Sequence, residues 1–290
     1  MAQQIVTFTN SNGLTATFSN FHPFIFSGLS GVSEIVAENN TDTTAYRDGE
    51  FYKYTTISKR QMILKCLIVT NTKQLYMQRR RELLALFNPK NGEGELTYVT
   101  NGITRKIKCI ADGFPDIPIT KRAKKTALEI PLLAFNPNFY NDDEDVTFSE
   151  TLGGLHFPLA ITSAGTNAGY KILEYSKFIK NEGDSECGII ATFTATGADV
   201  IKEVLQNITM GETLTLNVAL DVGDQIIINT NYGSKSITKV SDGIETDILN
   251  KLELPSDFIK LDIGENYISY NESSLNLSLN IEYTPVYLGV

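Results

Sequence analysis

The chain has 290 residues, 42% hydrophobic and 20% charged, which is an ordinary composition for a folded protein. Because this length exceeds the usual span of one hydrophobic core, we expect two domains. No apolar run approaches the ~18 residues of a membrane span, and residues 1–4 lack the features of a secretory signal. We therefore expect no membrane insertion, and a protein that stays where it is made or leaves inside a larger particle.

Charge divides the chain into two unlike halves. Residues 1–140 hold 17 Lys and Arg against 11 Asp and Glu, a net charge of +6, whereas residues 141–290 hold 8 against 23, a net charge of −15. An acidic half is a poor partner for nucleic acid, since phosphate binding needs cationic neutralisation. We predict one domain at 1–140, an acidic hinge or linker at 141–158 and a second domain at 159–290.

The first half begins with a predicted hairpin. Apolar alternation flanks Asn12-Gly13, and Asn-Gly is the strongest two-residue hairpin signal because both positions tolerate positive φ. The polar stretch 39–48 predicts a long exposed loop. Residues 62–70 are almost continuously apolar, which predicts a strand buried on both faces.

One helix is predicted, because side chains then recur at helical spacing. Asn71 or Thr72 can cap its start, and Asn88-Pro89 ends it. The stripe consists of Tyr76, Arg80, Leu83, Leu84 and Phe87.

Strands predominate after the helix. Asn101-Gly102 marks a second hairpin, and residues 126–134 alternate like a strand with one buried face. The second half reads as strand after strand separated by short turns, which predicts a β-sandwich. Its clearest strands are 188–193, 213–220, 225–229 and 275–283. The fold class we predict is mainly β with one helix.

Catalytic and metal motifs are scarce. His22 and His156 have no second histidine or cysteine at ligand spacing, so neither predicts a zinc site. Glu93 and Glu95 lie in a glycine-flanked turn, which favours two solvated carboxylates over an acid–base pair. The acidic run 142–145 lacks the spacing and the glycine of a calcium loop. We predict no catalytic residue, no metal site and no cofactor, and the sequence leaves the interface residues unknown.

Cysteines and basic clusters favour structural interpretations as well. Cys66, Cys109 and Cys187 form neither a disulfide framework nor a ligand set, and we expect buried thiols. The arginines 79–81 spread around a helix and form no flat basic face. The basic run 121–125 lacks the interleaved aromatic residues of a base-stacking surface, which favours an exposed or inter-subunit loop over nucleic-acid binding.

The order of motifs resembles the distal tail protein family of long-tailed bacteriophages, a component of the tail tip or baseplate. The resemblance covers nearly the whole chain. It rests on Asp48-Gly49, the strand from Arg60, the helix ending in Phe87-Asn88-Pro89-Lys90, Gly94-x-Leu96-Thr97-Tyr98, Phe135-Asn136-Pro137-Asn138-Phe139, Gly223-Asp224-x-Ile226-x-Ile228, Gly264-Glu265-Asn266 and the terminal alternating strand.

This resemblance implies a hexameric ring, in which an N-terminal belt domain surrounds a channel and a C-terminal galectin-like sandwich projects outward. The implied partners are the tail tube protein on one side and a tail-tip or baseplate protein on the other. DNA would contact the ring only in transit. The implied location is the virion tail, assembled in the cytoplasm of the bacterial host.

Two other functions stay open from the residues alone. A carbohydrate-binding sandwich aiding host adsorption would need an aromatic platform, and without tryptophan this falls to Tyr232, Tyr267 or Tyr270. A hydrolase that degrades cell walls is disfavoured by the shortage of histidine and the lack of a nucleophile elbow. We therefore expect a structural protein that is not an enzyme.

Overall fold

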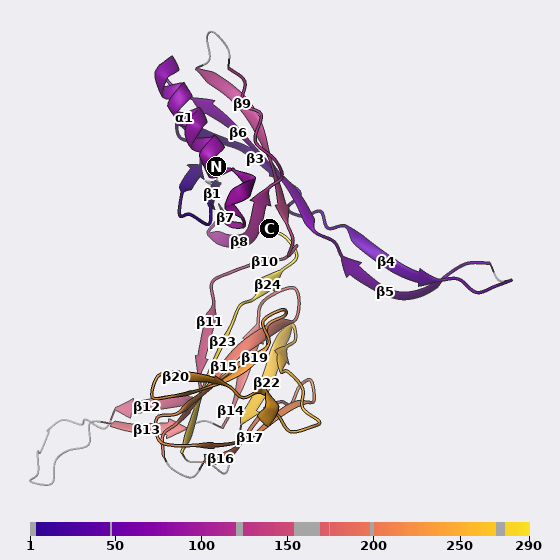
Figure 1. The fold of residues 1–290 in the computed structure, drawn as a ribbon, viewed down its shortest axis with the longest axis vertical. Helices are drawn as coiled ribbons and strands as arrows, with labels where there is room; N and C mark the ends of the chain where they lie inside the picture. Colours follow the sequence, from indigo (N-terminus) through magenta and orange to yellow (C-terminus); the bar gives the residue numbers. More distant parts are fainter. Residues whose placement is uncertain are drawn as a thin grey trace, which may run out of the picture. The chain divides into compact units, whose positions relative to one another are not determined.

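The structure is a computed structural model that describes residues 4–46, 48–119, 124–153, 169–173, 175–197, 200–270 and 276–290. It divides into two compact units, one formed by residues 1–141 with 287–290 and the other by residues 142–286. Strands predominate, and α1 (Lys73–Leu86) is the single α-helix among the described residues, which confirms the mainly β class (Figure 1). No helix in the described part of the chain is long and apolar enough to cross a membrane.

The division of the chain differs from the predicted one in two details. Residues 287–290, assigned above to the second domain, lie in the first unit. Within the predicted hinge, Glu144–Thr147 forms strand β11, which pairs with a strand of the second unit. The part of the hinge at 154–168 lies outside the described residues.

The first unit is built on a curved antiparallel sheet in the order β2-β1-β7-β8-β9-β6-β3. Its two ends meet, because the Ser19 amide donates to the Phe24 carbonyl at 3.2 Å and the Phe26 amide donates to the Ser19 carbonyl at 2.8 Å. The sheet therefore closes on itself like a barrel. Its elements are β1 (Ile5–Thr9), β2 (Thr15–Phe18), β3 (Phe24–Ser30), β6 (Arg60–Val69), β7 (Gly94–Thr100), β8 (Ile103–Ala111) and β9 (Lys125–Ala134), with the short β10 (Phe139–Tyr140), β24 (Val286–Tyr287) and the 3₁₀ turn η1 (Pro89–Asn91).

Turn chemistry explains the two hairpins. Asn101 and Gly102 have φ angles of +50° and +81°, so they form the tight two-residue turn predicted between β7 and β8. The first hairpin is also confirmed, but its turn is longer. There the side chain of Asn10 accepts hydrogen bonds from the amides of Asn12 and Leu14, both at 3.0 Å, and this side chain bridges the loop.

The prediction that the strand at 62–70 is buried on both faces was wrong. β6 alternates between buried and exposed residues. Met62 and Leu64 face the core, whereas Ile63 is 37% exposed and Lys65 pairs with Glu129 at 3.2 Å on the outside. No second layer covers this outer face among the described residues, so an apolar run alone does not establish burial on two sides.

Helix α1 packs against the barrel through its apolar stripe. Thr72 is the cap, since its Oγ1 accepts from the Leu75 amide at 3.2 Å. Tyr76 and Leu83 are fully buried, and the Tyr76 hydroxyl donates to the Pro118 carbonyl at 2.8 Å. The predicted helix and one of its two possible caps are therefore confirmed.

The second unit is a sandwich of two antiparallel sheets, which form one apolar core. One sheet has the order β11-β23-β15-β18-β19-β20, with β21 beside β15, and the other has the order β14-β22-β16-β17. Its elements are β12 (Ser149–Gly153), β13 (Gly169–Leu173), β14 (Ser176–Asn181), β15 (Cys187–Ala195), β16 (Val200–Asn207), β17 (Glu212–Leu220), β18 (Gln225–Asn229), β19 (Ser236–Ser241), β20 (Ile244–Asp247), η2 (Leu249–Lys251), β21 (Lys260–Leu261), β22 (Gly264–Tyr270) and β23 (Leu277–Tyr283). The sandwich is confirmed, while its likeness to galectins stays a prediction.

Candidate functional site

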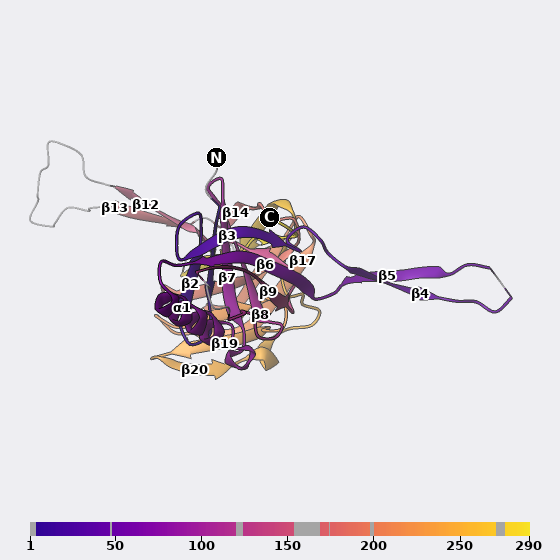
Figure 2. The same cartoon turned by 90° about the horizontal axis from the view of Figure 1, so that it is seen from above.

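A two-stranded arm extends from the first unit at the place where a loop was predicted. β4 (Ala37–Asp42) and β5 (Phe51–Ile57) pair antiparallel with each other and with no other strand of the described chain. Figures 1 and 2 show this hairpin leading away from the barrel, beyond the ends of β3 and β6. The prediction of a loop at 39–48 was wrong for residues 39–42, which lie in β4.

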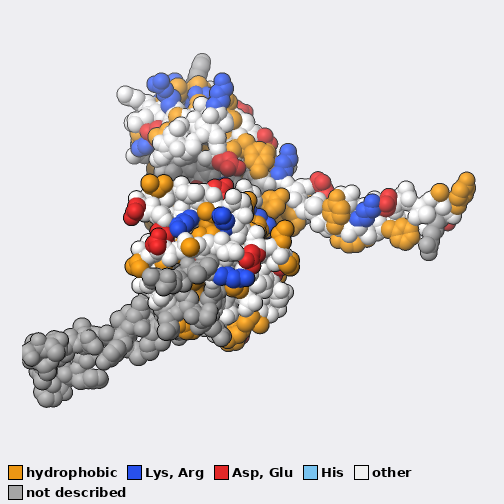
Figure 3. All heavy atoms as spheres, turned by 60° about the horizontal axis from the view of Figure 1, so that its bottom comes forward, with side chains coloured by type: hydrophobic (Ala, Val, Ile, Leu, Met, Phe, Trp, Pro, Cys, Tyr) orange, Lys and Arg blue, Asp and Glu red, His pale blue; other side chains and the backbone are white. Residues whose placement is uncertain are grey.

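Every residue of both arm strands is exposed, although several are aromatic. Phe51, Tyr52 and Tyr54 are 49%, 67% and 53% exposed, and Ile57 is 44% exposed. Figure 3 shows apolar side chains along the arm. A cluster of large apolar side chains at one surface marks an interaction site more often than a single one does.

Polar side chains hold the two arm strands together. Lys53 pairs with Asp42 at 2.8 Å, and the Thr55 hydroxyl donates to Asn39 Oδ1 at 2.6 Å. Exposed pairs of this kind contribute only about 0–1 kcal/mol each. An isolated hairpin in water is marginally stable, and both outer edges of this one offer unpaired backbone groups. The arm therefore has the composition and the geometry of a segment that is completed by another chain.

No nucleophile or metal site emerges from the predicted candidates. Burial raises the pKa of each of the thiols of Cys66, Cys109 and Cys187 to about 12, so these cysteines are protonated apolar fillers at neutral pH. His22 is exposed, and His156 lies outside the described residues. Within the described ranges, no group of three or more His, Cys, Asp or Glu is placed to hold a metal ion.

The paired carboxylates do not form an enclosed site. Glu93 and Glu95 line a shallow pocket of about 430 Å³ together with Lys108. Glu95 accepts a hydrogen bond from the Tyr140 hydroxyl at 2.7 Å. Such an open pocket gives a carboxyl group little of the desolvation that acid–base chemistry needs.

The basic clusters are largely engaged within the chain. Arg79 pairs with Glu82 at 2.6 Å, and Arg80 Nε donates to the Ile117 carbonyl at 2.9 Å, whereas Arg81 is exposed. Of the basic run 121–125, residues 121–123 lie outside the described chain and Lys125 begins β9. These residues present no continuous basic face in the part of the chain that the structure describes.

The three tyrosines proposed as a sugar platform have different environments. Tyr270 is 2% exposed and belongs to the core, whereas Tyr232 lies fully exposed in a turn. Tyr267 stacks on Phe178 with ring centroids 4.7 Å apart, and its hydroxyl bonds to the Ser176 hydroxyl at 2.9 Å. Phe178 is 65% exposed and was missed from the sequence, where the alternation of β14 is the only signal.

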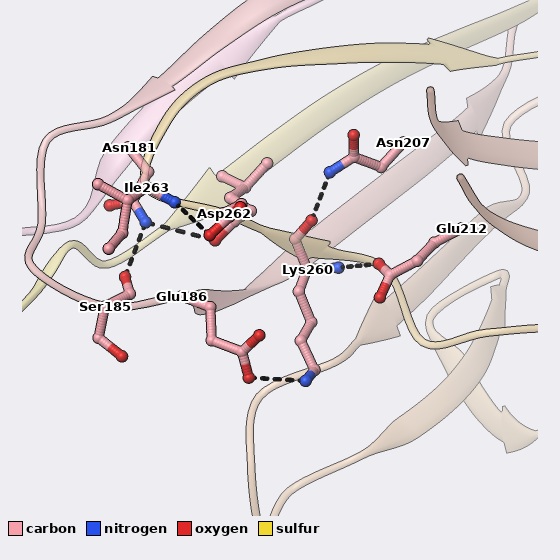
Figure 4. A network of polar contacts seen from close by, with 9 residues as sticks. Asn181, Ser185, Glu186, Asn207, Glu212, Lys260, Asp262 and Ile263 are labelled. Atoms are coloured by element: carbon pink, nitrogen blue, oxygen red, sulfur yellow. Dashed lines mark hydrogen bonds and ion pairs between the residues drawn. The ribbon is translucent and has the colours of Figure 1, made fainter. Parts of the chain in front are cut away.

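Several buried side-chain amides of the second unit are hydrogen-bonded within the described chain. Buried asparagines hold the segment around β21 in place, and Figure 4 shows this network. Asn207 Nδ2 donates to the Lys260 carbonyl at 2.7 Å and to Asn266 Oδ1 at 3.1 Å. Asn181 Nδ2 donates to the Ser185 carbonyl at 2.9 Å. A network with its amides paired in this way stabilises a fold rather than awaiting a ligand.

Two buried groups of this unit, the Tyr175 hydroxyl and the Glu203 carboxyl group, have no hydrogen-bond partner among the described residues. Glu203 on β16 is 1% exposed, and neither of its oxygens has a hydrogen-bond partner among the described residues. Its cross-strand neighbour is Leu216, and burial raises the pKa of its carboxyl group to about 7, although Lys239 acts in the opposite direction. This group costs stability when ionised, but it has no second catalytic group beside it in the described contacts.

Two protein families match the chain, one in its first half and the other in its second half. Residues 11–134 match the family described as phage tail protein RIFT-related domain, and residues 182–287 match the family described as siphovirus-type tail component, C-terminal domain. No curated protein matches the chain significantly in sequence.

Solved structures share the whole fold at low identity. The Dit protein of phage SPP1, described as a paradigm of the hub adsorption apparatus in phages that infect Gram-positive bacteria, is 12% identical, with a TM-score of 0.68 over 98% of this chain and 99% of that chain. A chain of the phage P2 baseplate, in its activated conformation with Ca, is 12% identical, with a TM-score of 0.50 over 97% and 98%. Both matched families are families of phage tail components. The chain belongs to the siphovirus-type distal tail protein family.

Proposed function

We propose that six copies of the chain form a ring through their first units, with each arm completed by a neighbouring copy. The observation that carries this proposal is the arm, whose aromatic side chains are exposed and whose two strands pair only with each other among the described strands. An arm that contacts a different surface on the next copy makes a head-to-tail interface, and such interfaces close into rings.

Within the virion tail, this ring joins the tail tube protein to a tail-tip or baseplate protein and surrounds the DNA channel. The role is structural and not enzymatic, and assembly takes place in the cytoplasm of the host. The family membership and the hub and baseplate descriptions of the two similar structures support this place in the tail. The buried, protonated thiols and the open carboxylate pocket support the absence of catalysis.

Imaging tests the proposal directly. Negative-stain images of the purified chain should show six-fold rings, and its mass in solution should be six times 32.1 kDa. A chain that remains monomeric at every concentration, alone and with its tail tube partner, would overturn the ring.

A second function has a specific observation in its favour, namely carbohydrate binding by the second unit. The exposed ring of Phe178, fixed by stacking on Tyr267, forms an aromatic platform on the outer face of the four-stranded sheet. A glycan array should detect binding that Phe178→Ala abolishes and that Tyr232→Ala, at an exposed turn, preserves. An array without any bound glycan would remove this function and leave the ring untouched.

A further inference from the structure

Arg60 occupies an unusual position at the start of β6. It is 2% exposed, and its guanidinium lies 4.9 Å from the centroid of the Phe139 ring. All of its hydrogen bonds to described residues go to main-chain carbonyl oxygens: Nε and Nη2 donate to one acceptor each, and the two hydrogens of Nη1 are shared among three. The acceptors are Gly31, Val32, Glu34, Pro137 and Leu288, at 3.0, 2.8, 3.4, 2.6 and 2.6 Å.

These acceptors come from three segments that are far apart in the sequence. One is the arm root, residues 31–36, which leads from β3 into β4. The second, at Pro137, follows β9. The third is the end segment, residues 287–290, which lies in the first unit. A single buried cation therefore connects the arm root to the end segment.

The arm root and the end segment also touch directly. A Cβ atom added to Gly289 would lie 3.4 Å from the Val32 carbonyl oxygen and 3.8 Å from the Ser33 Cα, so the main chains are in contact there. The end segment is fixed from its other side, because the Arg105 guanidinium stacks over the Tyr287 ring at 3.5 Å.

The arm root is pressed against β6 as well. Gly31 has a φ angle of +81°, and a Cβ atom there would come 2.0 Å from the Gln61 carbonyl oxygen. Beyond the root, the two arm strands pair only with each other. The direction of the arm is therefore set at its root, where Arg60 supplies three of the hydrogen bonds.

We propose that Arg60 and the end segment form a latch that fixes the direction of the arm, so that the first unit presents its arm in one orientation to the next copy. Arg60 is then a positioning residue for assembly. The proposal deepens the ring described above and rests on it for its biological meaning, but the latch itself is a property of a single chain.

The test measures the arm direction in a chain that does not assemble. Phe51→Ser, Tyr52→Ser and Tyr54→Ser together are expected to provide that background, and Thr44→Cys in the arm with Lys73→Cys in α1 carry two spin labels. The native thiols are buried and do not compete for the label. We expect one narrow distance distribution from pulsed electron resonance.

Two variants break the latch in different ways. Arg60→Lys keeps the charge but places all donors on one nitrogen, which cannot reach the three segments that Nε, Nη1 and Nη2 reach. Truncation after Tyr287 removes the Leu288 carbonyl and the Gly289 contact. Both should broaden the distance distribution and speed exchange of the Ser58 amide, which bonds to the Val36 carbonyl, by about ten- to a hundredfold. Removal of Val290 alone is the matched control and should change neither.

An unchanged distribution and unchanged Ser58 exchange in the truncated chain, with exchange in β7–β9 still slow, would overturn the latch. If Arg60→Lys fails to fold, the truncation decides alone. Failure of the ring is distinguishable, because it would show in the mass of the unsubstituted chain while leaving the label distances as predicted.

Discussion

The arm of the first unit and the asparagine network of the second unit differ in what they bury. The network buries polar groups that are hydrogen-bonded, whereas the arm leaves apolar groups exposed. In the network, buried amides such as that of Asn207 meet their partners inside the chain. In the arm, aromatic rings are exposed and strand edges are unpaired. A folded unit is stable only if its buried polar groups are hydrogen-bonded. Exposed apolar side chains contribute favourable free energy only when a partner covers them and removes them from water. The network amides of the second unit are paired within the chain, whereas in the proposed ring the arm of the first unit is covered by another copy.

The largest expected effect comes from removing the apolar surface of the arm. Phe51→Ser, Tyr52→Ser and Tyr54→Ser together should abolish the ring, since these side chains are the apolar part of the proposed interface. The free energy of unfolding of the monomer should change by less than about 0.5 kcal/mol, because exposed residues contribute little to it. Mass photometry measures the loss of the ring, and thermal unfolding measures the stability of the monomer.

A matched triple in the second unit separates the arm from apolar surface in general. Val222, Ile244 and Leu254 are 66%, 69% and 87% exposed. Their replacement by serine should leave the ring intact. Equal loss of assembly in both triples would show that the arm is not the specific interface.

A substitution in the asparagine network should lower the stability of the second unit and leave assembly of the ring unchanged. Asn207→Ala leaves the Lys260 carbonyl without this donor and the Met210 amide without its acceptor, and each unpaired buried group costs about 1–3 kcal/mol. We expect the second unit to lose about 3 kcal/mol of stability in urea unfolding, with assembly preserved below the transition. Asn217→Ala, at an exposed position of β17, is the control and should cost less than about 0.5 kcal/mol.

Substitution of Glu203 should have a smaller effect, and one that depends on pH, on the stability of the second unit. Its pKa in the folded chain is raised to about 7 from an ordinary value of 4.5, so folding favours the protonated form. The resulting stability is fully present below pH 4.5 and is lost as the pH rises to 7 and above. Glu203→Gln should remove this dependence and stabilise the second unit at pH 8 by up to about 3 kcal/mol.

Urea unfolding of both proteins at pH 5 and pH 8 measures the difference. Glu265, which is exposed on β22, gives the control substitution Glu265→Gln. A wild-type chain whose stability in the second unit does not fall between these pH values, relative to Glu203→Gln, would contradict the cost assigned to the buried carboxylate.

The sequence predicts the parts of this fold whose signals are local. The Asn101-Gly102 turn, the helix with its Thr72 cap and the alternating strands of the sandwich follow from φ preferences and periodicity, and the structure has all three. The arm was missed because its first strand consists of small and polar residues, and neither strand has a buried face to impose an alternation.

Two other residues show where sequence reasoning stops. Arg60 is visible only as one arginine before an apolar strand, because its acceptors lie up to 228 residues away. Phe178 was missed because its exposure and its contact with Tyr267 depend on the pairing of β14 with β22. Long-range pairing decides both environments, and no local pattern encodes it.

The central claim is that another copy of the same chain completes the arm, and a photo-crosslinker at position 54 tests it most directly. With benzoylphenylalanine in place of Tyr54, irradiation of the purified chain should yield covalent products of two to six copies, while the same group in place of Ile244 should yield none. A chain with the crosslinker at position 54 that gives only monomer, at concentrations where it is otherwise soluble and folded, would contradict the account.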